Sequence, residues 1–326
     1  MDLISVVVPC YNEEESLPIF LEALAGVARG MRERHEVSFE VVLVDDGSTD
    51  DTLKVMKRAS EQARVDAVDS VPLLDIHWLS FSRNFGKEAG LAAGLEHAQG
   101  NYVALMDADM QDPPNLLPEM YEILLTEHYD NVATRRVNRE GEPPIRSFFA
   151  RLFYKLINRI SKADIVDGAR DFRLMKRPMV DAILSLPEYN RFSKGIFGWV
   201  GFKTKWLPFV NVERVAGETK WSFFSLLLYS IDGIVAFSTV PLSIASVAGL
   251  LLCLVALAGV IFIVAKTIAF GDPVEGWPSL ACLITLLGGI QLLCLGIMGQ
   301  YLAKTYLETK HRPLYIVKES SDDRDR

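Results

Sequence analysis

Hydrophobic residues in the first 130 positions alternate between short β-branched runs and stretches with helical spacing. The runs at 4–9 and 40–44 each end in polar residues, as buried parallel strands do. Between them, leucine and phenylalanine recur every three or four positions over 16–32, which predicts a helix. The same reasoning predicts strands at 75–80 and 102–106 and a helix over 87–98.

This order of elements predicts an α/β fold with a doubly wound, mostly parallel sheet. Polar clusters follow each predicted strand, at 11–13, 45–48, 83–87 and 106–114. Ligands of such sheets bind beyond the carboxyl ends of the strands. We therefore expect the functional site at that edge.

Two later segments, 233–265 and 277–303, contain no charged residue. Each is longer than the roughly 20 residues that cross a bilayer as a helix. They predict a hairpin of two transmembrane helices, and the alternative is a pair of helices buried in a soluble core. Basic residues before and after the hairpin predict that both termini and the N-terminal region are cytoplasmic. We expect no cleavable signal before residue 9.

Composition narrows the class of protein. Half of the residues are hydrophobic (50%), which fits a membrane protein, and a net charge of -8 argues against a nucleic-acid partner. The segment PCYNEEES lacks GxGxxG and GxxxxGK[ST], so it does not predict a dinucleotide or P-loop site. The four cysteines lack metal-ligand spacing, and we expect no disulfide.

The segment MDADMQDPP predicts a cation site. Asp107 and Asp109 lie two residues apart after a predicted strand, and their side chains point the same way if the segment is extended. Neighbouring carboxylates repel unless a cation neutralises them, and oxygen ligands suit Mg²⁺ or Mn²⁺. Gln111 could add a neutral oxygen. The alternative is a solvated turn.

Several motifs together give the chain a resemblance to a known family. PCYNEEESL, VVLVDDGSTDDT, LSFSRNFGKEAGL, MDADMQDPP, ARDFRLM, RFSKGIFGWVG and GETKW occur in this order, and the apolar hairpin follows them. The sequence resembles family 2 glycosyltransferases of the GT-A fold. Within that family it resembles the polyprenyl-phosphate hexose synthases, which include dolichol-phosphate mannose synthase and bacterial undecaprenyl-phosphate glucosyltransferases.

The resemblance implies roles for individual residues. Nucleotide binding falls to Pro9, Tyr11, Glu13, Asp46, Arg83, Lys87 and Asp107, and metal binding to Asp107, Asp109 and Gln111. Asp171 corresponds to the family's catalytic carboxylate, although Arg170 stands where many relatives have glycine. The alternatives are a turn at Pro9, structural salt bridges for Arg83 and Lys87, and pairing of Asp171 with Arg170 or Arg173.

Two basic residues, Arg191 and Lys194, are candidate ligands of the acceptor phosphate, because their donors match phosphate oxygens. The alternative is a solvated basic loop. A basic amphipathic helix over 145–162 is expected to lie in the membrane interface, or else to pack on the core.

The predicted organisation is a glycosyltransferase domain at 1–218, a juxtamembrane helix at 219–232, the hairpin at 233–305 and a cytoplasmic tail at 306–326. We expect residues 318–326 to be disordered. Glycines in the second span could support a homo-oligomer.

The expected activity is inverting transfer of a hexose from a UDP-sugar to undecaprenyl phosphate at the cytoplasmic face of a bacterial inner membrane. Glucose and N-acetylglucosamine are favoured by resemblance. A separate flippase would move the product across the bilayer. The alternatives are a GDP-mannose-dependent mannose synthase and a non-catalytic membrane-anchored binding protein.

Overall fold

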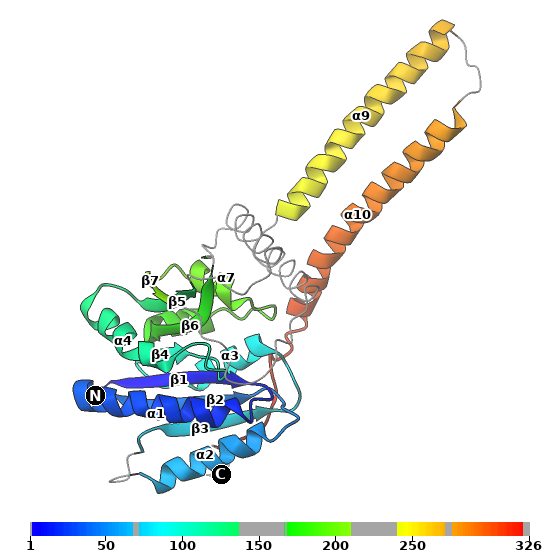
Figure 1. The fold of residues 1–326 in the computed structure, drawn as a ribbon. Coiled ribbons are helices and arrows are strands. Elements are labelled where there is room, and N and C mark those ends of the chain that lie inside the picture. Colours follow the sequence, from blue (N-terminus) through cyan, green and yellow to red (C-terminus); the bar gives the residue numbers. More distant parts are fainter. Residues whose placement is uncertain are drawn as a thin grey trace.

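The computed structural model describes residues 2–67, 72–136, 166, 168–209, 240–270 and 276–321. Its described strands form one sheet in the order β7-β5-β6-β4-β1-β2-β3-β8 (Figure 1). The strands are β1 (Leu3–Cys10), β2 (Ser38–Asp45), β3 (Asp75–Phe81), β4 (Tyr102–Leu105), β5 (Asn131–Arg136), β6 (Ala169–Lys176), β7 (Thr204–Phe209) and β8 (Val317–Ser320). The four strands predicted from the hydrophobic pattern are all present, as β1 to β4.

The sheet is mixed: most of its described strand pairs are parallel, as expected, and the others are antiparallel. The pairs β1–β2, β1–β4, β2–β3 and β5–β7 are parallel. The pairs β4–β6, β5–β6 and β3–β8 are antiparallel. The strands predicted from the sequence form the parallel centre of the sheet. The antiparallel strands β6, which is the ARDFRLM motif, and β8, in the tail expected to be disordered, were not predicted.

Helices cover both faces of the sheet. On one face α1 (Ser16–His35), α2 (Thr52–Val65) and α4 (Leu117–Thr126), which follows the short η1 (Pro114–Leu116), pack on one core. On the other face lie α3 (Lys87–His97), α6 (Arg177–Leu184) and α7 (Ser193–Trp199). A sheet covered by helices on both faces explains why its central strands are apolar throughout.

Helix α3 lies unusually close to β1 because it contains Gly94. A Cβ at that position would lie 2.2 Å from Cγ1 of Val7, so only glycine fits. Because α3 begins shortly after β3 ends, its first residue, Lys87, lies at the carboxyl edge of the sheet.

Two long helices, α9 (Val240–Phe270) and α10 (Trp277–Thr309), extend side by side away from the sheet (Figure 1). Within the described residues, one segment, Leu286–Thr309, is long and apolar enough to cross a membrane, and none of its most apolar window is buried. Helix α10 therefore agrees with the second predicted span, although it continues beyond residue 303. The first predicted span overlaps α9, and its residues 233–239 lie outside the described part.

The expectation of a disordered tail is wrong for residues 318–321. Residues 317–320 form β8, and Ser321 is buried with its hydroxyl accepting a hydrogen bond from the backbone N–H of Trp78. The predicted amphipathic helix at 145–162 and the juxtamembrane helix at 219–232 lie outside the described residues, as do residues 322–326.

Candidate active site

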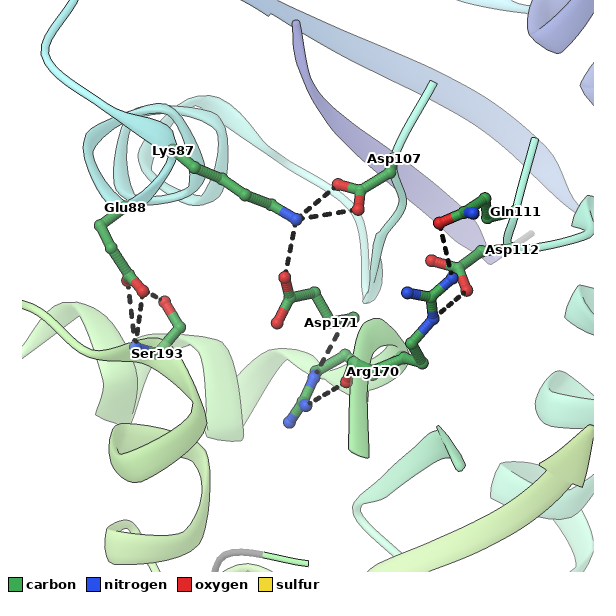
Figure 2. Close-up of polar contacts among 9 residues, drawn as sticks. Lys87, Glu88, Asp107, Gln111, Asp112, Arg170, Asp171 and Ser193 are labelled. Atoms are coloured by element: carbon green, nitrogen blue, oxygen red, sulfur yellow. Dashed lines mark hydrogen bonds and ion pairs between the residues drawn. The ribbon is translucent and has the colours of Figure 1, made fainter. Parts of the chain in front are cut away.

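One lysine joins two carboxylates at the carboxyl edge of the sheet. Lys87 begins α3, Asp107 follows β4, and Asp171 lies in β6. The Nζ atom of Lys87 lies 2.7 Å from Asp107 Oδ1 and 2.7 Å from Asp171 Oδ2 (Figure 2). Three elements far apart in the sequence therefore meet at a single ammonium group.

The charges in this cluster reinforce one another. Burial alone would raise the pKa of Asp171, but the nearby cations Lys87 and Lys194 hold that pKa well below its usual range. Burial would likewise lower the pKa of Lys87, and the carboxylates of Asp107 and Asp171 raise it above its usual value instead. The ammonium of Lys87 and the carboxylate of Asp171 therefore each favour the charged form of the other.

The residues after Asp107 form a tight, partly buried loop. Asp109 is only 8% exposed and its Oδ1 accepts the backbone N–H of Gln111 at 3.1 Å. Met110 between them has a φ of 60°, in the left-handed region that few non-glycine residues adopt. The loop therefore bends sharply between Asp109 and Gln111.

Arg170 fastens the far end of this loop (Figure 2). Its guanidinium donates to Gln111 Oε1 at 3.1 Å and to Asp112 Oδ1 at 3.3 Å. Asp112 is buried, and burial raises its pKa to about 7 although the charge of Arg170 opposes this. The residue that departs from the family pattern thus pairs with Asp112 and Gln111. The carboxylate of Asp171 forms an ion pair with Lys87, and Arg173 donates from its Nε atom to the backbone oxygen of Asp171 at 3.2 Å.

The donor set of this loop fits a hard cation in part. Asp107 and Asp109 supply carboxylate oxygens of the kind that Mg²⁺ and Mn²⁺ prefer. The side-chain oxygen of Gln111 is already bonded to Arg170, which leaves two carboxylates. Among the residues described in the structure there is no group of three or more His, Cys, Asp or Glu side chains suited to a metal. Such a cation would need further oxygens from a ligand.

Asp46 organises the loop after β3. Its two carboxylate oxygens accept the backbone N–H groups of Phe85 at 2.6 Å and Gly86 at 2.9 Å. The next residue, Gly47, has a φ of 67°, and a Cβ there would lie 2.5 Å from the carbonyl carbon of Arg83. Asp46 was predicted to contact the nucleoside, and in the structure it holds the loop that leads to Lys87.

The loops after β1 and β2 are joined by backbone to side-chain hydrogen bonds. The N–H of Asn12 donates to Ser48 Oγ at 3.0 Å, and the N–H of Glu13 donates to Thr52 Oγ1 at 2.8 Å. Tyr11, beside them, is 37% exposed. Pro9 packs toward Gly90 of α3, where a Cβ would lie 3.1 Å from the proline Cβ.

The remaining predicted residues line two different pockets. Arg83 and Arg191 line a pocket of about 270 Å³ together with Tyr189 and Leu314. Lys194 lines another, of about 230 Å³, together with Arg173, Phe197 and Trp206. Arg191 donates to the carbonyl oxygens of Leu186 at 2.7 Å and Ile183 at 3.3 Å. Arg191 and Lys194, the two predicted phosphate ligands, therefore line different pockets. The guanidinium of Arg191 bonds to carbonyl oxygens at the carboxyl end of α6.

Sequence reasoning missed the role of Glu88. Both of its carboxylate oxygens accept the backbone N–H of Ser193, at 3.1 and 3.0 Å, and one also accepts the serine hydroxyl (Figure 2). Arg173 was named only as a partner for Asp171. It is buried, with its guanidinium 3.5 Å from the ring centroid of Phe197, and burial lowers its pKa to about 9. For Glu88 and Arg173, the signal in the sequence was a charged side chain within or next to a motif with a predicted site residue.

The sequence matches the family model described as glycosyl transferase family 2 over residues 5–184. It is 41% identical over 315 residues to a prophage bactoprenol glucosyl transferase homolog of Escherichia coli strain K12, covering 97% of this chain and 98% of the relative. It is 39% identical over 315 residues to a bactoprenol glucosyl transferase of Shigella phage SfV, with 97% and 98% covered.

Similarity to solved structures is weaker. The glucosyl-3-phosphoglycerate synthase of Mycobacterium tuberculosis, crystallised with Mn²⁺, UDP-glucose and phosphoglyceric acid, is 18% identical with a TM-score of 0.43. The match covers 72% of this chain and 78% of that one.

Proposed function

Because this chain belongs to glycosyltransferase family 2, we propose that it transfers glucose from UDP-glucose to a polyprenyl phosphate at a membrane surface. The observation that carries this proposal is the similarity to bactoprenol glucosyl transferases along nearly the whole chain, which includes α9 and α10 as well as the sheet. Glucose is therefore preferred over N-acetylglucosamine.

The proposed reaction is a single in-line displacement. An oxygen of the lipid phosphate attacks the anomeric carbon, the bond from that carbon to the diphosphate breaks, and UDP leaves with the bonding electrons. The configuration of the anomeric carbon is inverted. A phosphate is already ionised at neutral pH, so no base is needed to activate it.

The cluster of Lys87, Asp107 and Asp171 suits this chemistry. Lys87 can neutralise negative charge that develops on the leaving diphosphate. Asp171, held as an anion, can stabilise positive charge at the anomeric carbon and orient the sugar. It acts in this proposal as an electrostatic group rather than as a base.

Asp107 and Asp109 would hold a divalent cation, Mg²⁺ or Mn²⁺, which neutralises the diphosphate when bound. The diphosphate would supply the further oxygens that the two carboxylates leave open. Gln111 is assigned to the loop and to Arg170 rather than to the cation. Tyr11 and the loops after β1 and β2 would hold the nucleoside.

The acceptor requires the protein to reach the headgroup layer of a membrane. We assign α9 and α10 to a hairpin that spans the bilayer, with the catalytic domain and both termini on the cytoplasmic face of a bacterial inner membrane. The flanking basic residues support this orientation. The product forms on that face, and its passage across the bilayer is assigned to a separate flippase. A homo-oligomer stays a prediction.

A donor panel tests the activity. The purified full-length protein in liposomes with undecaprenyl phosphate and Mg²⁺ or Mn²⁺ is given labelled UDP-glucose, UDP-N-acetylglucosamine, UDP-galactose or GDP-mannose. We expect lipid-linked glucose from UDP-glucose alone, and none from liposomes without the polyprenyl phosphate. Absence of lipid-linked sugar from every donor would refute the proposal, and transfer from GDP-mannose alone would replace it with a mannose synthase.

A further inference from the structure

The cytoplasmic end of the long helix α10 contacts a loop of the catalytic domain. Glu308, in the last turn of α10, accepts the backbone N–H of Tyr189 at 3.0 and 3.1 Å through its two oxygens. The N–H of Asn190 donates to the same carboxylate at 3.2 Å. Hydrogen bonds to a charged acceptor are stronger than neutral ones, so this contact is a specific one.

The other end of the same loop is fixed from α3. Glu88 accepts the N–H and hydroxyl of Ser193, and Lys194 follows directly. The residue before Glu88 is Lys87, the cation of the active site. The segment 189–194, called here the acceptor loop, ends with the first two residues of α7. It lies between α10 on one side and the catalytic cluster on the other.

The residues after α10 also join the end of this helix to the catalytic domain. The ring of Tyr315 stacks on Phe81 of β3 at 4.9 Å, and its hydroxyl donates to Glu96 of α3. The N–H of Ser82 donates to the carbonyl oxygen of Ile316 at 2.9 Å. Strand β8 then pairs with β3, where its Glu319 forms an ion pair with Lys57 at 2.6 Å.

These contacts exist only when the catalytic domain has one orientation relative to α10. A chain attached at a single point could rotate about it, whereas α10 is attached at Glu308 and again through β8. A phosphate anchored in a bilayer lies at a fixed depth, so an enzyme that uses it gains from a fixed height above the membrane.

We propose that Glu308 is a positioning residue that couples the end of α10 to the acceptor loop and so places Lys194 for a membrane-held phosphate. This inference rests on the proposed function. Glu308 itself touches no substrate in this scheme, since its oxygens are bonded to the backbone of the loop.

The test compares Glu308→Ala with Glu308→Gln in the full-length protein in liposomes. Alanine removes both acceptors, and we expect the KM for undecaprenyl phosphate to rise about tenfold, as expected for losing charge-assisted hydrogen bonds. The KM for UDP-glucose should stay unchanged. Glutamine keeps one oxygen that can accept an N–H, so we expect it to restore most of the loss.

A matched control is Glu119→Gln, which removes an exposed carboxylate from α4, on the opposite face of the sheet from α3 and α7. It should leave both KM values unchanged. Hydrogen exchange of a peptide covering residues 187–194 should quicken in Glu308→Ala and not in Glu119→Gln. If Glu308→Ala does not accumulate, Glu308→Asp, with a carboxylate one methylene shorter, should give the same change to a smaller extent.

Two results would overturn the inference. One is an unchanged KM for the lipid acceptor in Glu308→Ala, or in Glu308→Asp if it takes its place. The other is an equal rise in the KM values for lipid and UDP-glucose, which would mark a general structural role. Failure of the proposed function differs from both, because the unmodified protein would then make no lipid-linked glucose.

Discussion

The ammonium group of Lys87 lies 2.7 Å from the carboxylate of Asp171, although 84 residues separate the two in the chain. The same ammonium also contacts Asp107. Two carboxylates that belong to different motifs thus share one internal cation. Lys87 supplies the site with an ammonium group before any ligand binds.

Removing this charge should strongly reduce activity. Lys87→Met keeps a chain of similar length but leaves Asp107 and Asp171 without their shared cation. We expect kcat for lipid glucosylation to fall by about 100-fold or more, as for other lost electrostatic contacts to a transition state. Lys57→Met, which removes a lysine from a peripheral ion pair with Glu319, should change kcat little. Comparable rates for the two variants would contradict this assignment.

The effect of replacing Asp171 should not depend on pH. Because Lys87 and Lys194 hold the pKa of Asp171 below its usual range, this carboxylate is ionised throughout the range in which the enzyme is assayed. Protonation would be reached only as the pH falls through that lowered pKa. We therefore expect the ratio of wild-type to Asp171→Asn rates to stay constant from about pH 5.5 to 8.5. A ratio that rises with pH within this range would instead identify a titrating base.

Asp109→Asn should abolish cation binding without unfolding the protein. Its side chain is one of the two carboxylates assigned to Mg²⁺ or Mn²⁺, and an amide is a weaker ligand than a carboxylate. Binding of Mn²⁺ in the presence of UDP, followed by electron paramagnetic resonance, should be lost, and activity with it. Glu119→Gln, an exposed carboxylate in α4, provides the control. Removing metal from the wild type with EDTA should reproduce the loss of activity, and Mn²⁺ should restore it.

The pair Arg170 and Asp112 should be energetically coupled. Their side chains are 25% and 2% exposed, so removing the arginine leaves a buried carboxylate without its partner. We expect Arg170→Gly to lower the free energy of unfolding by about 2 kcal/mol, less than for a fully buried pair. Adding Asp112→Asn should recover part of that loss. Thermal unfolding of the wild type, the two single variants and the double variant gives the coupling energy of the pair. Strictly additive changes in the free energy of unfolding would show that the pair is not coupled.

A comparison of two glycines tests the close packing of loops at the site. Gly47 and Gly201 have φ values of 67° and 75°, so alanine strains the backbone at both. Only at Gly47 would the new Cβ meet another backbone, that of Arg83, whereas nothing lies within 4 Å at Gly201. Gly47→Ala should lower the melting temperature more than Gly201→Ala, and it should weaken binding of UDP, measured by calorimetry. Equal losses of stability would mean that the loops can separate.

The central sheet was predictable from the sequence because its strands are short, apolar and bounded by polar residues. The position of the site followed from the same pattern, since residues after parallel strands meet at one edge. The polar clusters that contain Lys87 and Asp107 were placed at that edge on those grounds, and the role of Lys87 came from the family resemblance. Their joint contact with Asp171 was not predictable, because β6 enters the sheet antiparallel to β4 and no local pattern specifies that neighbour.

The bonds of Arg191 and the order of the C-terminal segment were not predictable for a related reason. Arg191 was predicted as a phosphate ligand, which stays a prediction, and its guanidinium also donates to carbonyl oxygens at the end of α6, a contact set by tertiary packing. Residues 318–326 are polar and few, as in disordered tails. The order of the C-terminal segment comes from β3, whose exposed edge accepts a further strand.

Strand β8 also imposes an order on biosynthesis. Strands β1 to β7 precede α9 and α10 in the chain, whereas β8 follows them. Because a protein is made from its N-terminus, β8 leaves the ribosome only after both long helices have been translated. Among the described strands, β8 is the partner of this edge of β3. The described sheet of a nascent catalytic domain is therefore complete only after residues 317–320 have been made.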